Sequence, residues 1–244
     1  MVAFTVNPNS ALYSQLQRIA EVFNAELFNG ELPEFVFTLQ RGNTSVGYFS
    51  PDQWSSTDGV LASEISINPC YLAHYSLLQL FQTIAHELCH LWQHHRGQSR
   101  PRRGYHNQEW AAKMEDIGLI PSDTGKGGGK KIGQKMSDYP SPNGKFIQIS
   151  QALIESGFGL EWIDRDFNAR QISYRVMPKE ITNKLNSPLL NLFPELAPLV
   201  KLGREQKRKI KYHCPQCGIK VWGKTGLRIT CECCDRKLEN DVLH

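Results

Sequence analysis

The sequence predicts an α+β fold followed by a linker region and a C-terminal zinc ribbon. Three features lead to this prediction: helical and strand-like apolar patterns alternate in the first 120 residues, a stretch rich in glycine and lysine follows, and two C-x-x-C pairs lie near the end. A helix, a small sheet and two further helices would pack as layers around one core. Because 244 residues exceed the roughly 100–200 residues of a usual domain, a smaller appended module is also expected.

Three helices are expected in the first 120 residues. Between Ala11 and Phe28, apolar side chains recur at spacings of three and four, the pattern of an amphipathic helix, and Asn29-Gly30 ends it. The same pattern predicts helices from Leu77 to His95 and from Asn107 to Ile117. Each of these helices offers one apolar face to the core.

A small sheet is expected between the first and second helices. The runs Phe35–Leu39 and Ala62–Ile67 are typical of strands, and Val46–Phe49 is a candidate for a third strand between them. Asn68-Pro69 ends the last strand, since proline has no amide to donate to a neighbour.

A domain boundary is predicted where the composition changes. Between Thr124 and Lys135 the chain has five glycines and four lysines, a composition typical of a flexible basic linker. Beyond it we expect a helix near Phe146–Glu155 and a short strand near Leu160–Ile163, in a stretch without a recognisable site. The expected division is a first domain at 1–120, a linker at 121–139, an intervening region of unknown role at 140–210 and the ribbon at 211–244.

The second expected helix carries the sequence His86-Glu87-Leu88-Cys89-His90. At about 100° per residue, His86, Glu87 and His90 share one face, and apolar side chains fill the opposite face. Two imidazoles one turn apart can bind one Zn²⁺ and leave room for a third ligand and a water. Zinc lowers the pKa of that water to about 7, and Glu87 is placed to act as general base and acid. The pattern therefore predicts a catalytic zinc on this helix.

The third ligand of this zinc is not determined by the helix itself. His94 lies eight residues from His86, about 12 Å along the helix axis, and His95 is expected to point to the apolar face, so neither can join both motif histidines. The turn rich in Gly, Pro and Arg that follows could bring the next helix back to the site, with His106 or Glu109 in its first turn. Glu109 has a second explanation, because a carboxylate at a helix start is stabilised by the helix dipole.

A second metal site is predicted near the C-terminal end. Cys214 and Cys217 form one C-x-x-C pair, and Cys231 and Cys234 form another after thirteen intervening residues, the spacing of a zinc ribbon. Four thiolates fill the coordination shell, so this zinc is expected to be structural. The residues between the pairs are typical of two strands and a turn, and such a small module needs its metal to fold. The sequence thus predicts two zinc ions per chain.

Several motifs together resemble the SprT-like family of zinc metallopeptidases, which includes Spartan-type repair proteases. The resemblance covers somewhat under half of the chain and implies a zincin-like domain in which His86, His90 and His106 bind the catalytic zinc and Glu87 is the catalyst. Well-understood members act on proteins bound or crosslinked to DNA, and members often carry a ribbon like the one predicted here. The motifs are Phe28-Asn29-Gly30-Glu31-Leu32-Pro33, Gly47-Tyr48-Phe49, Ile67-Asn68-Pro69, the His-Glu-Leu-Cys-His helix and His106-x-x-x-Trp110-x-x-x-Met114.

Charge is unevenly distributed along the chain. Residues 1–120 carry 7 basic and 11 acidic side chains, a net charge of −4, whereas residues 121–244 carry 21 and 13, a net charge of +8. A basic half is compatible with a nucleic-acid partner, and single-stranded DNA is the expected one. The residues expected to contact phosphates or to stack on a base are Arg204, Lys207, Arg208, Lys209, Lys211 and Trp222.

The sequence also bears on the compartment of the chain. No run approaches the ~18 apolar residues that span a bilayer, and Met1–Val6 lacks the basic region and cleavage site of an export signal. C-x-x-C pairs favour metal over disulfides in a reducing compartment. We therefore expect a cytoplasmic chain with no membrane partner.

The hypothesis from sequence is a zinc-dependent endopeptidase that hydrolyses peptide bonds of protein substrates, DNA-bound proteins among them, with a metal-activated water. One alternative is a non-catalytic nucleic-acid-binding adaptor with the same fold. Another is a zinc hydrolase that acts on a non-peptide substrate, since the same water attacks other carbonyls. Glu87 argues against the adaptor, because a purely structural zinc needs no acid beside an open metal position.

Overall fold

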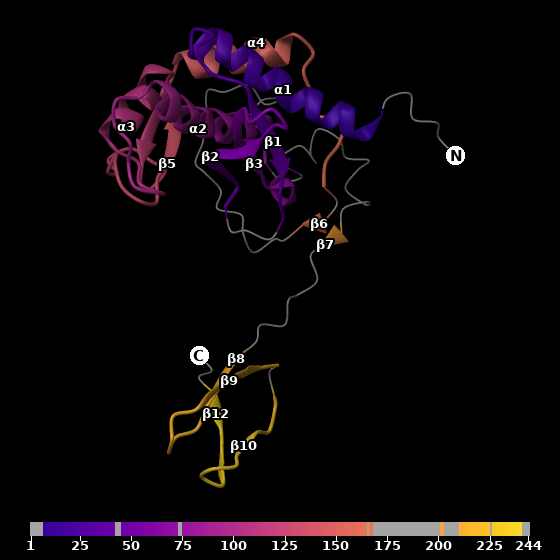
Figure 1. Ribbon diagram of the computed structural model, residues 1–244, viewed down its shortest axis with the longest axis vertical. Coiled ribbons are helices and arrows are strands. Elements are labelled where there is room, and N and C mark those ends of the chain that lie inside the picture. The colour runs from indigo at the N-terminus through magenta and orange to yellow at the C-terminus, as the bar shows by residue number, and fades with distance from the viewer. Residues whose placement is uncertain are drawn as a thin grey trace. The chain divides into compact units, whose positions relative to one another are not determined.

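The computed structural model describes residues 7–41, 45–72, 75–164, 166–167, 201–202, 210–224 and 226–240. It divides into two compact units, Met1–Leu202 and Gly203–His244 (Figure 1). The first unit holds the helix with the paired histidines, and the second holds the two C-x-x-C pairs. In the described part of the chain, no helix is long and apolar enough to cross a membrane.

The helices of the first unit agree with the expected ones to within a few residues. The second of them, α2, starts with a capping box, in which the Ser76 hydroxyl accepts the Gln79 amide and the Gln79 side chain accepts the Ser76 amide. This motif satisfies amides that would otherwise be buried without partners. The helices are α1 (Pro8–Leu27), the 3-10 helix η1 (Pro69–Tyr71), α2 (Leu77–Arg96), α3 (Gln108–Asp116) and α4 (Lys145–Glu155).

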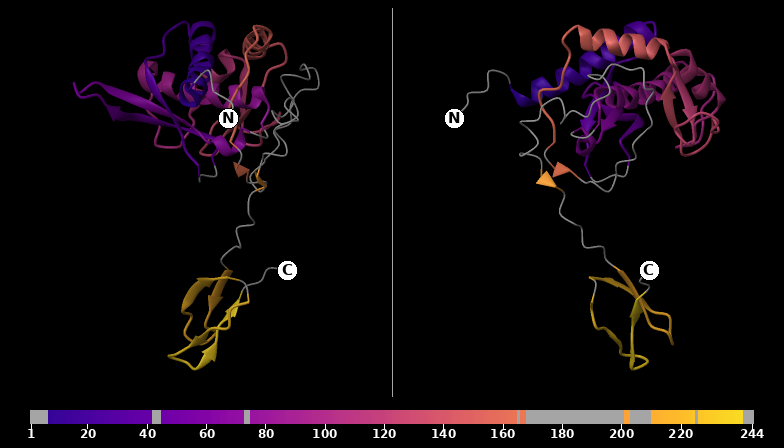
Figure 2. Two further views of the ribbon diagram at one scale, coloured as in Figure 1. Left: turned by 90° about the vertical axis from the view of Figure 1, so that its right-hand side faces the viewer. Right: turned by 180° about the vertical axis from the view of Figure 1, so that it is seen from behind.

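The main sheet has three strands in the order β1–β3–β2, formed by β1 (Phe35–Leu39), β2 (Gly47–Ser55) and β3 (Leu61–Ile67). All three expected strands are confirmed. β1 runs parallel and β2 antiparallel to the central β3. The β2–β3 hairpin extends away from the helices (Figure 2). β2 is an edge strand, and its pairing shifts at a bulge between Ser50 and Trp54.

One hydrophobic core joins the sheet and the helices of the first unit. α1 packs against both α2 and α4, and the views agree that α1 and α4 run side by side. The Phe23 ring of α1 lies 5.8 Å from both Phe81 of α2 and Phe146 of α4, in edge-to-face contacts. α4 therefore belongs to this core, and the intervening region expected from residue 140 begins inside the first unit.

The segment expected to be a flexible linker is folded. β4 (Leu119–Ser122) pairs antiparallel with β5 (Ser137–Pro140). The glycine- and lysine-rich loop between them is tied down, because the Ser122 hydroxyl donates to the Lys126 carbonyl at 2.6 Å. The predicted boundary at residue 120 is therefore wrong. The glycines provide tight turns, three of them with positive φ, rather than a break between domains.

The segment after α4 differs from the expected one. The strand expected near Leu160–Ile163 does not form, since this segment pairs with no strand of the described residues, and Leu160 packs into the core instead. A short parallel pair forms instead between β6 (Asp166–Phe167) and β7 (Lys201–Leu202).

The second unit consists of short strands around the four cysteines. β8 pairs with both β9 and β12, while β10 pairs with β11. The two strands predicted between the cysteine pairs form as β9 and β10, but they do not pair with each other as a hairpin, because β9 pairs with the strand before it and β10 with the strand after it. The strands are β8 (Ile210–His213), β9 (Lys220–Gly223), β10 (Thr230–Cys231), β11 (Arg236–Lys237) and β12 (Glu239–Asn240).

Candidate metal centre and its cleft

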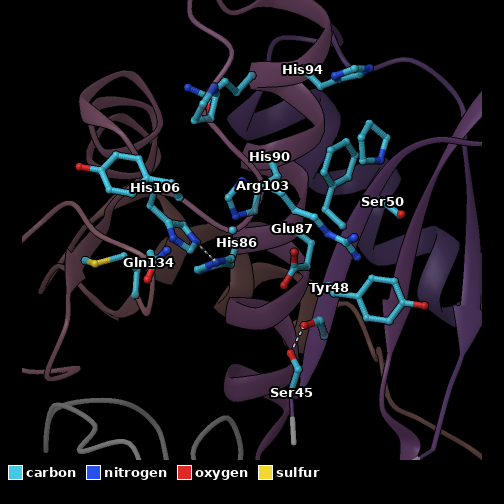
Figure 3. A pocket seen from close by; sticks show the side chains of 18 of the residues that line it. Ser45, Tyr48, Ser50, His86, Glu87, His90, His94, Arg103, His106 and Gln134 are labelled. Atoms are coloured by element: carbon cyan, nitrogen blue, oxygen red, sulfur yellow. Dashed lines mark hydrogen bonds between the residues drawn. The ribbon is translucent and has the colours of Figure 1, made fainter. Parts of the chain in front are cut away.

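Three histidines of the first unit converge on one point. His86 and His90 lie one turn apart on α2, and His106 lies two residues before α3. One ligand nitrogen of each lies within 4.8 Å of the other two, and the His86 and His106 Nε2 atoms are 3.3 Å apart (Figure 3). Nitrogens bound to one tetrahedral Zn²⁺ at roughly 2.0–2.1 Å are about 3.3 Å from each other. The cluster therefore has the spacing of a zinc site.

Glu109, the other candidate for the third ligand, faces the loop before α3 instead. Its carboxylate accepts hydrogen bonds from the amides of Gln98 and Ser99, at 2.6 and 3.0 Å, from the Ser99 hydroxyl at 2.6 Å and from the Gln93 side chain at 3.1 Å. Burial raises the pKa of Glu109, but these hydrogen bonds favour the ionised form more strongly and bring the pKa to about 2. Glu109 thus orders the loop that leads to His106.

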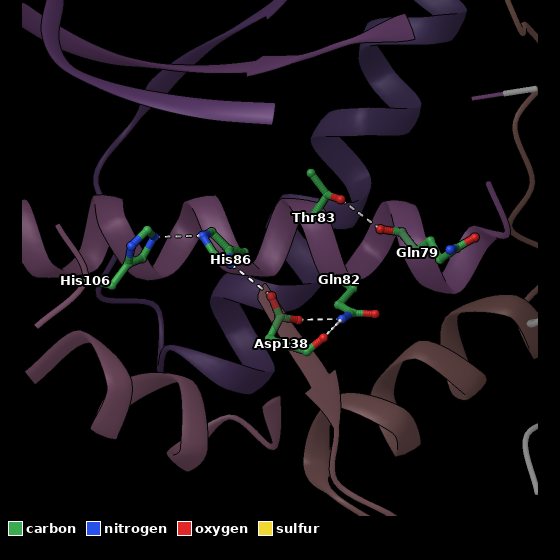
Figure 4. A network of polar contacts seen from close by, with 6 residues as sticks. All are labelled: Gln79, Gln82, Thr83, His86, His106 and Asp138. Atoms are coloured by element: carbon green, nitrogen blue, oxygen red, sulfur yellow. Dashed lines mark hydrogen bonds and ion pairs between the residues drawn. The ribbon is translucent and has the colours of Figure 1, made fainter. Parts of the chain in front are cut away.

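Hydrogen bonds orient two of the three imidazoles. His86 Nδ1 lies 3.0 Å from the Asp138 carboxylate of β5, and His106 Nδ1 lies 3.1 Å from the Gly133 carbonyl. Both partners are acceptors, so each Nδ1 carries the proton and each Nε2 is turned to the shared point. The Gln82 side chain in turn donates to the Asp138 carbonyl and carboxylate at 2.8 and 2.5 Å (Figure 4).

Aromatic stacking orients the third imidazole. The His90 ring lies nearly parallel to the Trp110 ring at 5.3 Å and to the Phe49 ring at 6.2 Å. Burial, followed by the charges of His86 and His106, lowers the pKa of His90 well below its usual value. Burial and then His86 lower the pKa of His106 to about 4. Both rings are therefore neutral at neutral pH, the form that binds a metal ion.

The histidines line a cleft of about 1020 Å³. Glu87 projects into the same cleft, although its side chain is largely buried. Gly47 of β2 makes this arrangement sterically feasible, because a Cβ there would lie 2.9 Å from Thr83 Cγ2 and 3.4 Å from Glu87 Oε1. Because Glu87 lines the same cleft as the three histidines, a metal ion bound by them would have the Glu87 carboxylate nearby.

The cleft carries an excess of positive charge. Arg100, Arg102, Arg103 and Lys135 line it, whereas Glu87 is the one carboxylate among the described residues of its lining. The Arg102 guanidinium also lies 5.1 Å from the centre of the Tyr105 ring. The walls of the cleft therefore attract acidic groups.

Comparison with known proteins agrees with this site. A protein of Salmonella typhimurium, described as "Uncharacterized protein in mucB 3'region", is 44% identical over 50 residues, which are 20% of this chain and 68% of that protein. The model of the SprT-like family matches residues 16–125. The chain belongs to the SprT-like family. No solved structure matches it. The matched segment includes all three histidines and Glu87.

Two residues of this SprT-like site were missed by sequence reasoning. Asp138 and Gly133 lie beyond the segment that the family model matches, in the stretch predicted to be a linker. One signal points to a residue such as Asp138: the second ring N–H of a histidine ligand usually donates a hydrogen bond to a carboxylate or carbonyl, so an acid is expected near the histidine pair.

The second candidate metal site of this SprT-like protein is the cysteine cluster. The sulfurs of Cys214, Cys217, Cys231 and Cys234 lie within 4.8 Å of one another, and the Cys217–Cys231 distance is 3.5 Å. A hydrogen bond from the Cys217 amide is the main reason that the pKa of Cys214 is lowered to about 7. The Cys217 side chain has the opposite effect on Cys231 and Cys234, because its hydrogen bonds with them are the main cause that raises their pKa. Thiols this close cannot all ionise unless a cation lies between them. Cys233 is exposed and outside the cluster.

The residues expected to contact DNA are only partly described. Trp222 of β9 is 62% exposed, and Lys211 of β8 is its partner in the strand register. The remaining four, Arg204, Lys207, Arg208 and Lys209, lie outside the described residues.

Proposed function

We propose that the chain is a zinc-dependent endopeptidase that hydrolyses peptide bonds of proteins with a metal-activated water. The observation that carries this proposal is the convergence of three imidazole nitrogens, 3.3 Å apart in the case of His86 and His106, in a cleft that also contains Glu87. Among the described residues, His86, His90 and His106 would hold a zinc ion here, and a set of three protein ligands is typical of catalytic zinc sites that also bind water. When bound, the ion would lower the pKa of a water and polarise the scissile carbonyl.

Residues of the chain perform the proton transfers and the positioning. Glu87 takes the proton of the attacking water and returns it to the leaving amine. Asp138 and Gly133 keep the imidazoles of His86 and His106 in the metal-binding orientation. β2 is an edge strand along the cleft, so its backbone can pair with an extended substrate segment.

The test is cleavage of a protein substrate by wild type and by Glu87→Gln, with and without a chelator. The amide keeps the shape of the side chain but cannot accept a proton, so we expect zinc content to be retained and turnover to be lost. Glu21→Gln, on the exposed face of α1, is the matched control. Cleavage by Glu87→Gln at the wild-type rate would remove Glu87 from the mechanism. A wild-type protein that binds zinc and cleaves no protein would favour the adaptor or the non-peptide hydrolase.

We also infer that the second unit binds single-stranded nucleic acid and that substrates include DNA-bound proteins. The observation that favours this is one face of β8 and β9 on which Trp222 is exposed. Lys220 lies on the same face two residues earlier on β9, and Lys211 of β8 is the cross-strand partner of Trp222. An exposed indole between two lysines can stack on a base while the ammonium groups contact phosphates.

Oligonucleotide binding by Trp222 variants tests this second proposal. Loss of one stacked base costs about 1–3 kcal/mol, so Trp222→Ala should weaken binding roughly 5- to 150-fold. Trp222→Phe keeps a ring for stacking and should recover much of the affinity. Equal affinity of Trp222→Ala and wild type would exclude this face from binding.

A further inference from the structure

A second group of metal-ligating side chains lies one turn beyond His90 on α2. One ligand atom from each of Asp52, His94 and His95 lies within 4.8 Å of the other two. His94 Nε2 is 3.0 Å from the Asp52 carboxylate, and the rings of His94 and His95 are 4.8 Å apart and almost perpendicular. None of the three residues belongs to the cluster around His86.

The fold brings these side chains together from two elements. Asp52 lies in the bulge of β2, where the pairing with β3 shifts, and His94 and His95 lie in the last turn of α2. A bulge redirects side chains relative to the rest of its strand. Phe49, which precedes the bulge, contacts both His94 and His90, with ring distances of 6.0 and 6.2 Å. The group therefore lies beside the cleft of the candidate metal centre, and His94 is part of the cleft lining (Figure 3).

We propose that Asp52, His94 and His95 bind a divalent transition-metal ion, zinc above all, and that this ion fastens the β2 bulge to the end of α2. Two imidazoles and one carboxylate form a typical ligand set for zinc, with water in the remaining position. Ligands of one zinc are about 3.3 Å apart, close to the separation of Asp52 and His94, and the exposed His95 side chain can rotate to complete the set.

Neighbouring charges limit the strength of this site. After burial and His94, the positive charges of Arg100 and Arg96 lower the pKa of His95, so they lie close enough to oppose a cation. Asp52 provides the compensating negative charge. We therefore expect weaker zinc binding here than at the buried histidine cluster.

The experiment is a calorimetric titration of the full-length, zinc-loaded chain with further zinc. Wild type should bind one additional equivalent. Asp52→Asn and His95→Gln should each weaken this step by more than the about 10- to 100-fold that loss of an outer-shell partner costs. Asp58→Asn, which neutralises an exposed acid of the same hairpin, should bind like wild type.

His95→Gln keeps the test independent of folding. Asp52→Asn also weakens a contact between β2 and α2, whereas His95 is exposed and forms no hydrogen bond with other described residues. No additional equivalent in wild type would overturn the proposal. Unchanged binding by His95→Gln would also overturn it, since the three-ligand set would then be incorrect. Neither outcome bears on the proposed peptidase activity.

Discussion

Asp138 acts on the candidate metal centre through His86. It is fully buried on β5, 52 residues away from His86 in the sequence. A carboxylate that accepts the Nδ1 proton determines which nitrogen faces the metal and makes that nitrogen more basic. Gln82 holds Asp138 in turn with two hydrogen bonds. The orientation of a residue on α2 thus depends on a strand that sequence reasoning assigned to a linker.

We expect Asp138→Asn to lower zinc affinity at the histidine cluster by about 10- to 100-fold, because the neutral amide is a weaker acceptor for His86 Nδ1. Competition with a chromophoric chelator measures this affinity, and Asp116→Asn, an exposed neutralisation at the end of α3, is the control. The same chelator curve for Asp138→Asn and wild type would show that Asp138 does not position His86.

Whether the residues of the site share one helix or come from separate elements determines which of them the sequence predicts. His86, Glu87 and His90 lie on one helix, so the 3.6-residue period alone places them together. Asp138 and Gly133 could not be predicted in this way, because their segment meets α2 and His106 only through tertiary contacts. Composition does not distinguish a glycine-rich loop held by backbone hydrogen bonds from a free linker.

The ribbon shows the same limit at the level of strand pairing. The cysteine spacing predicted the cluster of four sulfurs, because the two knuckles are local turns. The strands around them have two to four residues, too few for periodicity to indicate which strands pair. The sequence therefore does not indicate that β9 pairs with β8, the strand before it, as the structure shows.

The contact between β2 and α2 gives an element-scale prediction. A methyl group at position 47 would lie 2.9 Å from Thr83 Cγ2 and 3.1 Å from the Ser66 carbonyl, so Gly47→Ala must push β2 away from α2. We expect a loss of about 1–3 kcal/mol in the free energy of unfolding, typical of overpacking. Cleavage should also slow, because the shifted β2 would no longer pack beside the Glu87 carboxylate. Gly159→Ala, whose added methyl group meets nothing within 4 Å, is the control. Chemical denaturation that gives equal stability for Gly47→Ala and wild type would contradict this.

The two units of the whole molecule should respond differently to metal removal. The first has a large apolar core, whereas the buried apolar residues described in the second are Tyr212, Cys214 and Cys231. We expect a chelator to unfold the second unit and leave the core of the first intact, since small metal domains fold only with their ion. NMR spectra of the full chain, with separate signals for each unit, measure this.

The zinc content of cysteine variants tests whether the metal that the chelator removes is held by the ribbon cysteines. Cys214→Ser combined with Cys217→Ser should lower tightly bound zinc from two ions to one, while Cys233→Ser should leave it unchanged because that thiol is outside the cluster. Zinc content that does not fall in the double variant would show that the ribbon cysteines hold no metal.

The uneven charge of the chain predicts that DNA binding by its basic half promotes peptidase activity on proteins bound to the same DNA. If the basic second half contacts four or five phosphates of a single strand, log K should fall with log salt concentration with a slope of roughly −3 to −3.5, at about 0.7 per contact. A protein substrate bound to the same strand is then present at a high effective concentration and should be cleaved faster than the free protein. Charge reversal of Lys207, Arg208 and Lys209 should flatten the slope and abolish this acceleration, while cleavage of a free peptide stays unchanged. Fluorescence titrations at several salt concentrations and cleavage assays with and without DNA measure both effects. A slope that is unchanged in the triple variant would exclude these side chains from DNA binding and leave the peptidase proposal intact.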